Sequence, residues 1–224
     1  TEAATLTSQF NQRLMAASKA GGLRVERPES LAGLSEDDIA AAAQAARDRG
    51  LSESGFIPLL NTTQQPALAS LKDRQTREQL FNSSWLRSEK NDENDTRPLI
   101  LRLVEIRARQ AGLLGFDDYA SWKVADQMAK TPAAALAFMR EITPAARARA
   151  EAEQAAIQQV IDQQHGDFQV QAWDWDFYAD KVRQNTYAFD DSQVRPYLAL
   201  DTVLAEGVFW TASRLFGLRF VERV

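Results

Sequence analysis

The chain has 224 residues, of which 45% are hydrophobic and 25% charged, and its formal net charge is −5 at pH 7. This length and composition are typical of a globular protein that buries one sizeable core or two small ones. The weak net charge gives no single-sign field for binding phosphates. We therefore expect no nucleic-acid partner.

No run of the sequence approaches the roughly 18 continuous apolar residues of a membrane span, so we expect no membrane contact. The chain has no cysteine, which excludes disulfides and thiolate ligands. This absence fits a reducing cytoplasm or a cysteine-poor secreted protein. Of the two compartments we favour the cytoplasm.

Two helices are predicted near the start of the chain. From residue 6 to residue 20 the apolar side chains follow helical spacing, and Gly21 with Gly22 supplies a stop. Ser35 with Asp38 resembles a capping box, and Gly50 can take the left-handed position that closes a second helix.

The run from Phe56 to Thr63 is the one plausible strand in the first half. Pro58 cannot donate a ladder hydrogen bond, which confines this segment to an edge strand or an irregular extension. Pro66 then opens a helical stretch. Thr76 with Gln79 predicts another capping box ahead of an apolar run.

The segment from Arg97 to Phe116 predicts the clearest helix, with Asp95 or Thr96 as its cap and Gly115 as its stop. Asp117 or Asp118 can cap the next helix. The apolar stripe of the first of these helices consists of Leu99, Leu103, Ile106 and Leu113.

Thr131 followed by Pro132 predicts the start of a long helix that ends at His165 and Gly166, and Pro144 should kink or restart it. Asp174 is predicted to cap a helix after a short linker. A further turn or helix should begin near Asp190.

The last predicted helix runs from Asp201 to Phe216, with Gly217 as its terminator. The residues from 218 to 222 then alternate like a strand. The expected fold class is all-α, an irregular array of helices with at most short strands near 56–63 and 218–222. We divide it into regions 1–65, 66–165 and 166–224, which can also form one continuous domain.

The sequence contains no recognisable catalytic constellation. A helical zinc site commonly draws two ligands from His-Glu-x-x-His, and His165 is the only histidine. Its place at a helix end favours an exposed or capping role. Glycine-rich phosphate loops and a Gly-x-Ser-x-Gly elbow are also missing. We therefore predict no catalytic, cofactor-binding or metal-binding residue in this chain.

Two further groups of residues have a structural and a functional interpretation. The acidic run Glu89–Asp95 lacks the glycine and closing glutamate of a calcium loop, so a solvated turn between helices is the favoured interpretation. The aromatic residues of the second group are more often core than the lining of a peptide cleft. They are Trp173, Trp175, Phe177 and Tyr178.

Several strings resemble the thimet oligopeptidase family, most closely its peptidyl-dipeptidase branch, also called dipeptidyl carboxypeptidases. The Leu-Leu-Gly-Phe turn at Leu113–Phe116 is followed by the Met-Ala-Lys step at Met128–Lys130. Downstream, WDWDFYADKVR at Trp173–Arg183 and the segment that begins RPYLALDTVLAEG match in the same order, although Leu198 stands where the family more often has phenylalanine. Upstream, NTTQQPA is similar to the bacterial members.

This resemblance implies a cytoplasmic enzyme that removes dipeptides from the C-termini of oligopeptides, using zinc-bound water and a glutamate base. The zinc ligands of that family lie beyond Val224. The resemblance therefore implies that zinc belongs to the parent enzyme, that this chain is an internal fragment inactive alone, and that it supplies scaffold and part of the substrate-channel wall.

Two alternatives remain open. The chain could be a self-contained helical module for protein–protein interaction, or, with weaker support, a complete hydrolase that uses no metal. The parent reading frame distinguishes the first alternative from the fragment. In the fragment interpretation the strand-like residues 218–224 lack a pairing partner, so we expect them to be poorly ordered or to contact another copy of the chain.

Overall fold

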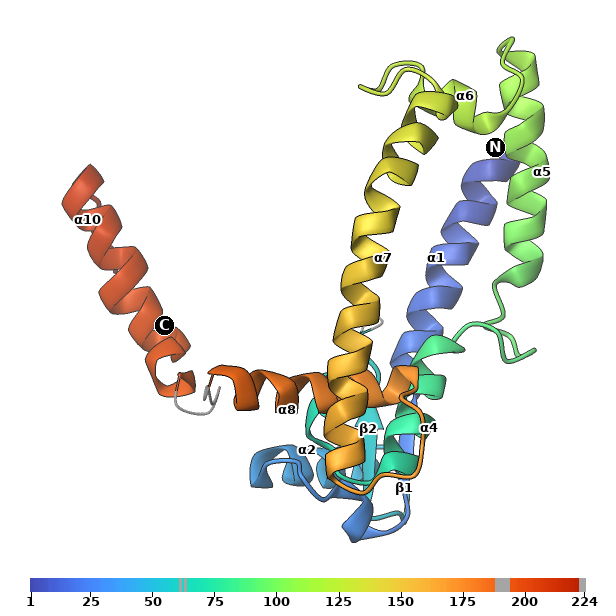
Figure 1. Cartoon of the computed structure of the whole chain (residues 1–224). Coiled ribbons are helices and arrows are strands. Elements are labelled where there is room, and N and C mark those ends of the chain that lie inside the picture. The colour runs from blue at the N-terminus through green and yellow to red at the C-terminus, as the bar shows by residue number, and fades with distance from the viewer. Residues whose placement is uncertain (61, 63, 188–193, 222–224) are drawn as a thin grey trace. The chain divides into compact units, whose positions relative to one another are not determined.

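The computed structural model describes residues 1–60, 62, 64–187 and 194–221. The chain divides into two compact units, the first unit Thr1–Asp180 and the second unit Lys181–Val224, and each is described by itself. Helices account for most of the described residues (Figure 1). The predicted all-α class is therefore confirmed.

The first unit begins with helix α1, Glu2–Ala20, which leads directly into strand β1, Gly22–Val25. The predicted stop at Gly21 is confirmed, but this residue is extended, with φ −75°. The chain therefore continues into a strand that the sequence analysis did not predict. The next elements are the 3₁₀ helix Pro28–Leu31, helix α2 at Glu36–Arg47 and strand β2 at Gly55–Pro58.

Strands β1 and β2 form a two-stranded antiparallel sheet, with Gly22 opposite Pro58 and Val25 opposite Gly55. Only β2 was predicted, and it is shorter than the expected 56–63. Both strands are edges, as Pro58 required. β1 escaped prediction because its four residues, two of them polar or glycine, are too few for a visible alternation.

A leucine cluster forms the core beneath this sheet. Its buried members are Leu59, Leu68, Leu71 and Leu80. A second cluster joins Val25, Leu31 and Ala42, so α2 is held against the sheet. Gly33 takes φ +101°, and a Cβ there would lie 2.0 Å from the Ser70 carbonyl oxygen. A side chain at this position would push the two segments apart.

The predicted capping box at Thr76 and Gln79 is wrong. After the short helix α3, Ala67–Ser70, helix α4 runs from Arg74 to Trp85 with Asp73 as its cap. The Asp73 Oδ2 accepts hydrogen bonds from the Thr76 backbone N–H at 3.0 Å and from the Thr76 hydroxyl. Thr76 is thus the third residue of the helix, and aspartate is an equally good cap.

The Asp73 cap predicts a pH dependence. Chiefly because Thr76 donates to the carboxylate, the pKa of Asp73 lies below its ordinary value of 3.8. A depressed folded-state pKa contributes stability above the unfolded value, and this contribution is lost as the pH falls below about 4. Asp73→Asn should keep the cap. In urea unfolding measured from pH 6 to pH 2.5, the free energy of unfolding of this variant should decline less steeply than that of the unaltered chain. Parallel declines would contradict this prediction.

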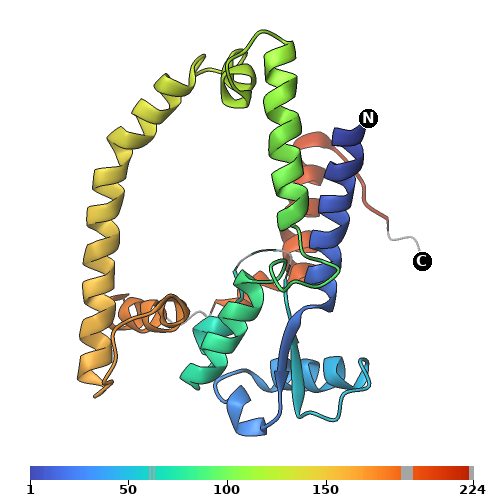
Figure 2. The ribbon, with the colours of Figure 1, turned by 90° about the vertical axis from the view of Figure 1, so that its right-hand side faces the viewer.

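Helix α5, Arg97–Leu113, lies alongside α1 (Figures 1 and 2). Leu99 and Leu103 of its predicted stripe are buried. Leu113 is 81% exposed, so this part of the prediction is wrong. The helix ends at Leu113, and Gly115 with φ +80° reverses the chain there as predicted.

Asp118 caps the short helix α6, Tyr119–Val124, and Thr131 caps helix α7, Pro132–Gln163. Of the predicted kink or restart at Pro144, the restart does not occur, because α7 continues through this residue. Proline removes one helical hydrogen bond. The adjacent Thr143 hydroxyl donates to the Met139 carbonyl at 2.6 Å, and alanine-rich flanks favour the helix on both sides.

The chain continues through the 3₁₀ helix Ala172–Asp174 into helix α8, Trp175–Tyr187. The turn predicted near Asp190 lies outside the described residues. In the second unit the 3₁₀ helix Arg195–Leu198 precedes helix α9, Leu200–Thr202.

The last predicted helix is present, but its centre is a π-helix at Val203–Phe209 that continues into helix α10, Trp210–Phe216. Gly217 closes it with φ +66°, as predicted. Residues 218–221 form no strand in the described part of the chain. Instead, the Phe220 ring stacks on Phe209 with centroids 4.4 Å apart. Within the described ranges, no helix carries an apolar stretch long enough to cross a membrane.

Candidate functional site

The residues weighed for chemistry do not come together as an active site. His165 is exposed and follows the end of α7 with φ +60°. Among the described residues, no group of three His, Cys, Asp or Glu side chains could hold a metal ion. That zinc is bound elsewhere than in this chain stays a prediction.

The acidic run forms the predicted turn between α4 and α5, but Asp95 is not solvated. It is only 7% exposed, and its carboxylate accepts hydrogen bonds from the backbone of Asn91 and Arg97, at 3.0 Å each. The Arg97 guanidinium contacts the same carboxylate and holds the pKa of Asp95 well below its ordinary range. The carboxylate is satisfied by protein donors, which explains its burial.

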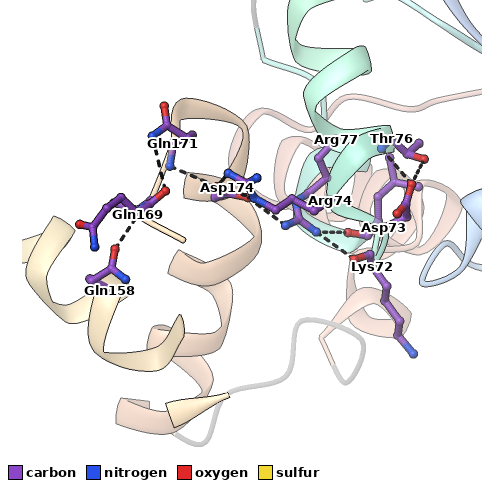
Figure 3. Close-up of polar contacts among 11 residues, drawn as sticks. Lys72, Asp73, Arg74, Thr76, Arg77, Gln158, Gln169, Gln171 and Asp174 are labelled. Atoms are coloured by element: carbon purple, nitrogen blue, oxygen red, sulfur yellow. Dashed lines mark hydrogen bonds and ion pairs between the residues drawn. The ribbon is translucent and has the colours of Figure 1, made fainter. Parts of the chain in front are cut away.

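The most distinctive polar group is an arginine–aspartate cluster, made of Arg74, Arg77 and Asp174 (Figure 3). Asp174 is fully buried and Arg77 is 1% exposed. The Arg74 Nε lies 3.1 Å from both carboxylate oxygens, and the Arg77 Nη2 lies 3.0 Å from Oδ1. The Gln171 backbone N–H completes the shell at 3.1 Å from Oδ2. Asp174 directly precedes α8 and forms a capping box with Gln171, but its ion pairs with the two arginines were not predicted.

Aromatic rings cover the two guanidinium groups. Arg74 lies 4.2 Å from the Phe168 ring centroid, and Arg77 lies 4.3 Å from that of Phe177. Of the predicted aromatic group, Tyr178 is buried and the other three are half-buried. These contacts favour the core interpretation, and they lower the cost of burying the cations.

A second set of contacts ties the same segment to α7. The Gln158 side chain donates to the Phe168 carbonyl at 3.0 Å and accepts from the Val170 N–H at 2.9 Å. Residues 168–174 therefore bridge the C-terminal end of α7 and the N-terminal end of α4. Figure 3 shows Gln158, Asp174 and the two arginines in this order along the bridge.

Arg87 organises another buried centre. Its guanidinium donates to the carbonyls of Leu60, Thr62 and Ser84 and to the hydroxyls of Ser18 and Ser84, at 2.7–3.2 Å. These bonds match the five N–H donors of an arginine. They fix the end of α4 to α1 and to the loop after β2.

The arginine–aspartate cluster and the Arg87 centre both hold segments of the chain in position. Arginine stays protonated at any physiological pH, so neither centre can exchange protons as an acid or base through its cations. Sequence analysis missed all three arginines. The only available signal was the spacing of Arg74 and Arg77, which places both on one face of a helix, and solvated helices show this spacing just as often.

The comparisons with known proteins extend these observations. The model of peptidase family M3 matches residues 67–224, from the first residue of α3 onward. The chain is 66% identical over 223 residues to dipeptidyl carboxypeptidase of Escherichia coli, and equally to that of Salmonella typhimurium. It is 29% identical over 222 residues to oligopeptidase A of Haemophilus influenzae.

These matches cover 100% of the chain for the two dipeptidyl carboxypeptidases and 97% for oligopeptidase A, but only 33% and 32% of the relatives' own lengths. The chain thus spans about a third of the curated relatives that it matches. The family model covers well over half of the chain. This chain belongs to peptidase family M3.

Proposed function

We propose that this chain is part of a zinc metallopeptidase that removes C-terminal dipeptides from oligopeptides in the cytoplasm. The observation that carries the proposal is the 66% identity to dipeptidyl carboxypeptidase along the whole chain. Within such an enzyme the chain would supply scaffold and part of the wall of the substrate channel.

The zinc would be bound by other parts of the polypeptide. The chain has one histidine and no cysteine, and the described carboxylates form no cluster suited to a metal ion. Among the described residues, the donor set of a structural or catalytic zinc site is therefore lacking.

Exposed apolar side chains support the proposal that this chain is one part of a larger protein. On the first half of α7 Phe138 is 63% exposed and Ile142 is 51% exposed, and in the second unit Trp210 is 59% and Phe216 73% exposed. Apolar surfaces of this kind mark contact sites. We propose that the other two thirds of the enzyme cover them.

A chimera tests the proposal. The third of E. coli dipeptidyl carboxypeptidase that matches this chain would be replaced by it, and release of dialanine from N-acetyl-tetraalanine would be measured. We expect release by the chimera, its loss on chelation and its return with zinc. The isolated chain should release no dialanine and retain no stoichiometric zinc after dialysis.

The intact E. coli enzyme and the same enzyme without the matching third are the controls. Hydrolysis by the isolated chain, or one tightly held zinc ion, would show that the chain has a site of its own and would contradict the proposal. A folded chimera without activity would also contradict it. In that case the alternative of an independent helical interaction module would be favoured.

A further inference from the structure

The outer edge of β1 offers backbone groups that the sheet does not use. The Leu59 N–H donates to the Gly21 carbonyl at 3.2 Å, which makes these residues a hydrogen-bonded pair. Because such pairs alternate along an antiparallel ladder, Leu23 and Val25 also bond to β2. The N–H and C=O of Arg24 therefore point away from β2.

Two other residues confirm this alternation. Pro58, which has no N–H, stands opposite Gly22 in a non-hydrogen-bonded pair, where the ladder uses no N–H from either residue. The Gly22 carbonyl points outward and accepts a hydrogen bond from the Ser83 hydroxyl of α4 at 2.9 Å. Among the described residues no such partner is found for the Arg24 backbone.

A cleft of about 350 Å³ opens beside this edge. One wall is formed by the residues from Leu23 to Arg27, and the other by the N-terminal end of α4 and its cap. Ser83 closes the Gly22 end, so the cleft extends along the edge from Arg24 onward. The α4 wall consists of Asp73, Gln75, Thr76 and Gln79.

The charges of the cleft select no ionic ligand. Arg24 and Arg27 carry positive charge, and Glu26 and Asp73 balance them. The Asp73 carboxylate is already engaged by Thr76. What the cleft offers is one outward backbone donor and acceptor, facing two exposed glutamine side chains.

We propose that this cleft binds a short extended segment of an oligopeptide, which pairs with the N–H and C=O of Arg24 as an added strand. Addition to a free sheet edge is a general mode of peptide recognition, in which the main chain supplies the hydrogen bonds. The amides of Gln75 and Gln79 can bond the opposite side of the segment. The choice of an oligopeptide rests on the proposed function, and the inference adds a peptide subsite within this chain.

The test uses the isolated chain labelled with nitrogen-15 and titrated with N-acetyl-tetraalanine amide. We expect a saturable downfield shift of the Arg24 amide proton, with smaller shifts at Leu23 and Gln79. The same peptide with methylated backbone nitrogens has no N–H to donate to the Arg24 carbonyl, and its methyl groups crowd the edge, so it should cause clearly smaller shifts. No saturable shift with the first peptide, or equal shifts with both, would overturn the proposal.

Three variants separate backbone pairing from side-chain contact. Arg24→Ala removes the side chain but keeps the N–H and should still bind. Arg24→Pro also loses the outward N–H, with φ fixed by its ring, and should abolish the shifts of the neighbouring residues. Gln79→Trp fills the cleft from the exposed face of α4. It should abolish the peptide-induced shifts without altering β1. If Arg24→Pro fails to fold, Gln79→Trp decides, and unchanged binding by it would overturn the proposal.

This measurement needs no hydrolysis. Failure of the peptide subsite would leave the chimera active, whereas failure of the proposed function would leave the chimera inactive whatever the titration shows. The two results are therefore distinguishable.

Discussion

Replacing Asp174 with alanine is expected to lower the free energy of unfolding of the first unit by about 3–5 kcal/mol. The substitution leaves the Arg77 guanidinium, 1% exposed, without its carboxylate partner. It also removes the acceptor of the Gln171 N–H. Urea unfolding followed by circular dichroism would measure the change.

Matched variants test the cause. Asp167→Ala removes an exposed aspartate from the same segment and should change stability by no more than about 0.5 kcal/mol. Arg74→Ala should cost less than Asp174→Ala, because the Arg74 side chain is 34% exposed and leaves the Arg77–Asp174 pair intact. Equal effects of Asp167→Ala and Asp174→Ala would show that the buried cluster does not hold this segment in place.

Replacing Leu80 with alanine should destabilise the first unit by about 2–5 kcal/mol. The Leu80 side chain is 0% exposed in the cluster with Leu59, Leu68 and Leu71. Truncation leaves a cavity between α4 and the sheet that the surrounding side chains can fill only in part. Thermal and urea unfolding would both report the loss.

Leu101→Ala is the control for Leu80→Ala, because Leu101 lies in a helix but is 69% exposed. It should change the unfolding free energy of the isolated chain by no more than about 0.5 kcal/mol. A comparable loss in both variants would mean that Leu101 is covered in solution, for example by a second copy of the chain. Dependence of the midpoint on protein concentration would reveal such a contact.

The sequence by itself determined where most helices begin and end. The Ser35 hydroxyl accepts from the Asp38 N–H at 3.2 Å, and that of Thr131 accepts from the Ala134 N–H at 3.2 Å, as their positions predicted. Gly50 and Gly217 close helices with φ +65° and +66°. These outcomes were predictable because a cap or a left-handed glycine depends on residues within one turn.

The family could also be recognised from the sequence, because several segments typical of it occur in the same order along the chain. The resemblance found there agrees with the match to peptidase family M3 and with the 66% identity to dipeptidyl carboxypeptidase. The absence of a histidine–glutamate motif from these residues could also be read directly.

Only the tertiary structure decided what Asp174 does. Its local pattern indicated a helix cap, whereas its partners Arg74 and Arg77 lie 100 and 97 residues earlier in the chain. The free edge of β1 likewise exists only because β2 pairs with its other side. Such features require segments that are distant in sequence to meet, and a local pattern carries no information about which distant groups will become neighbours.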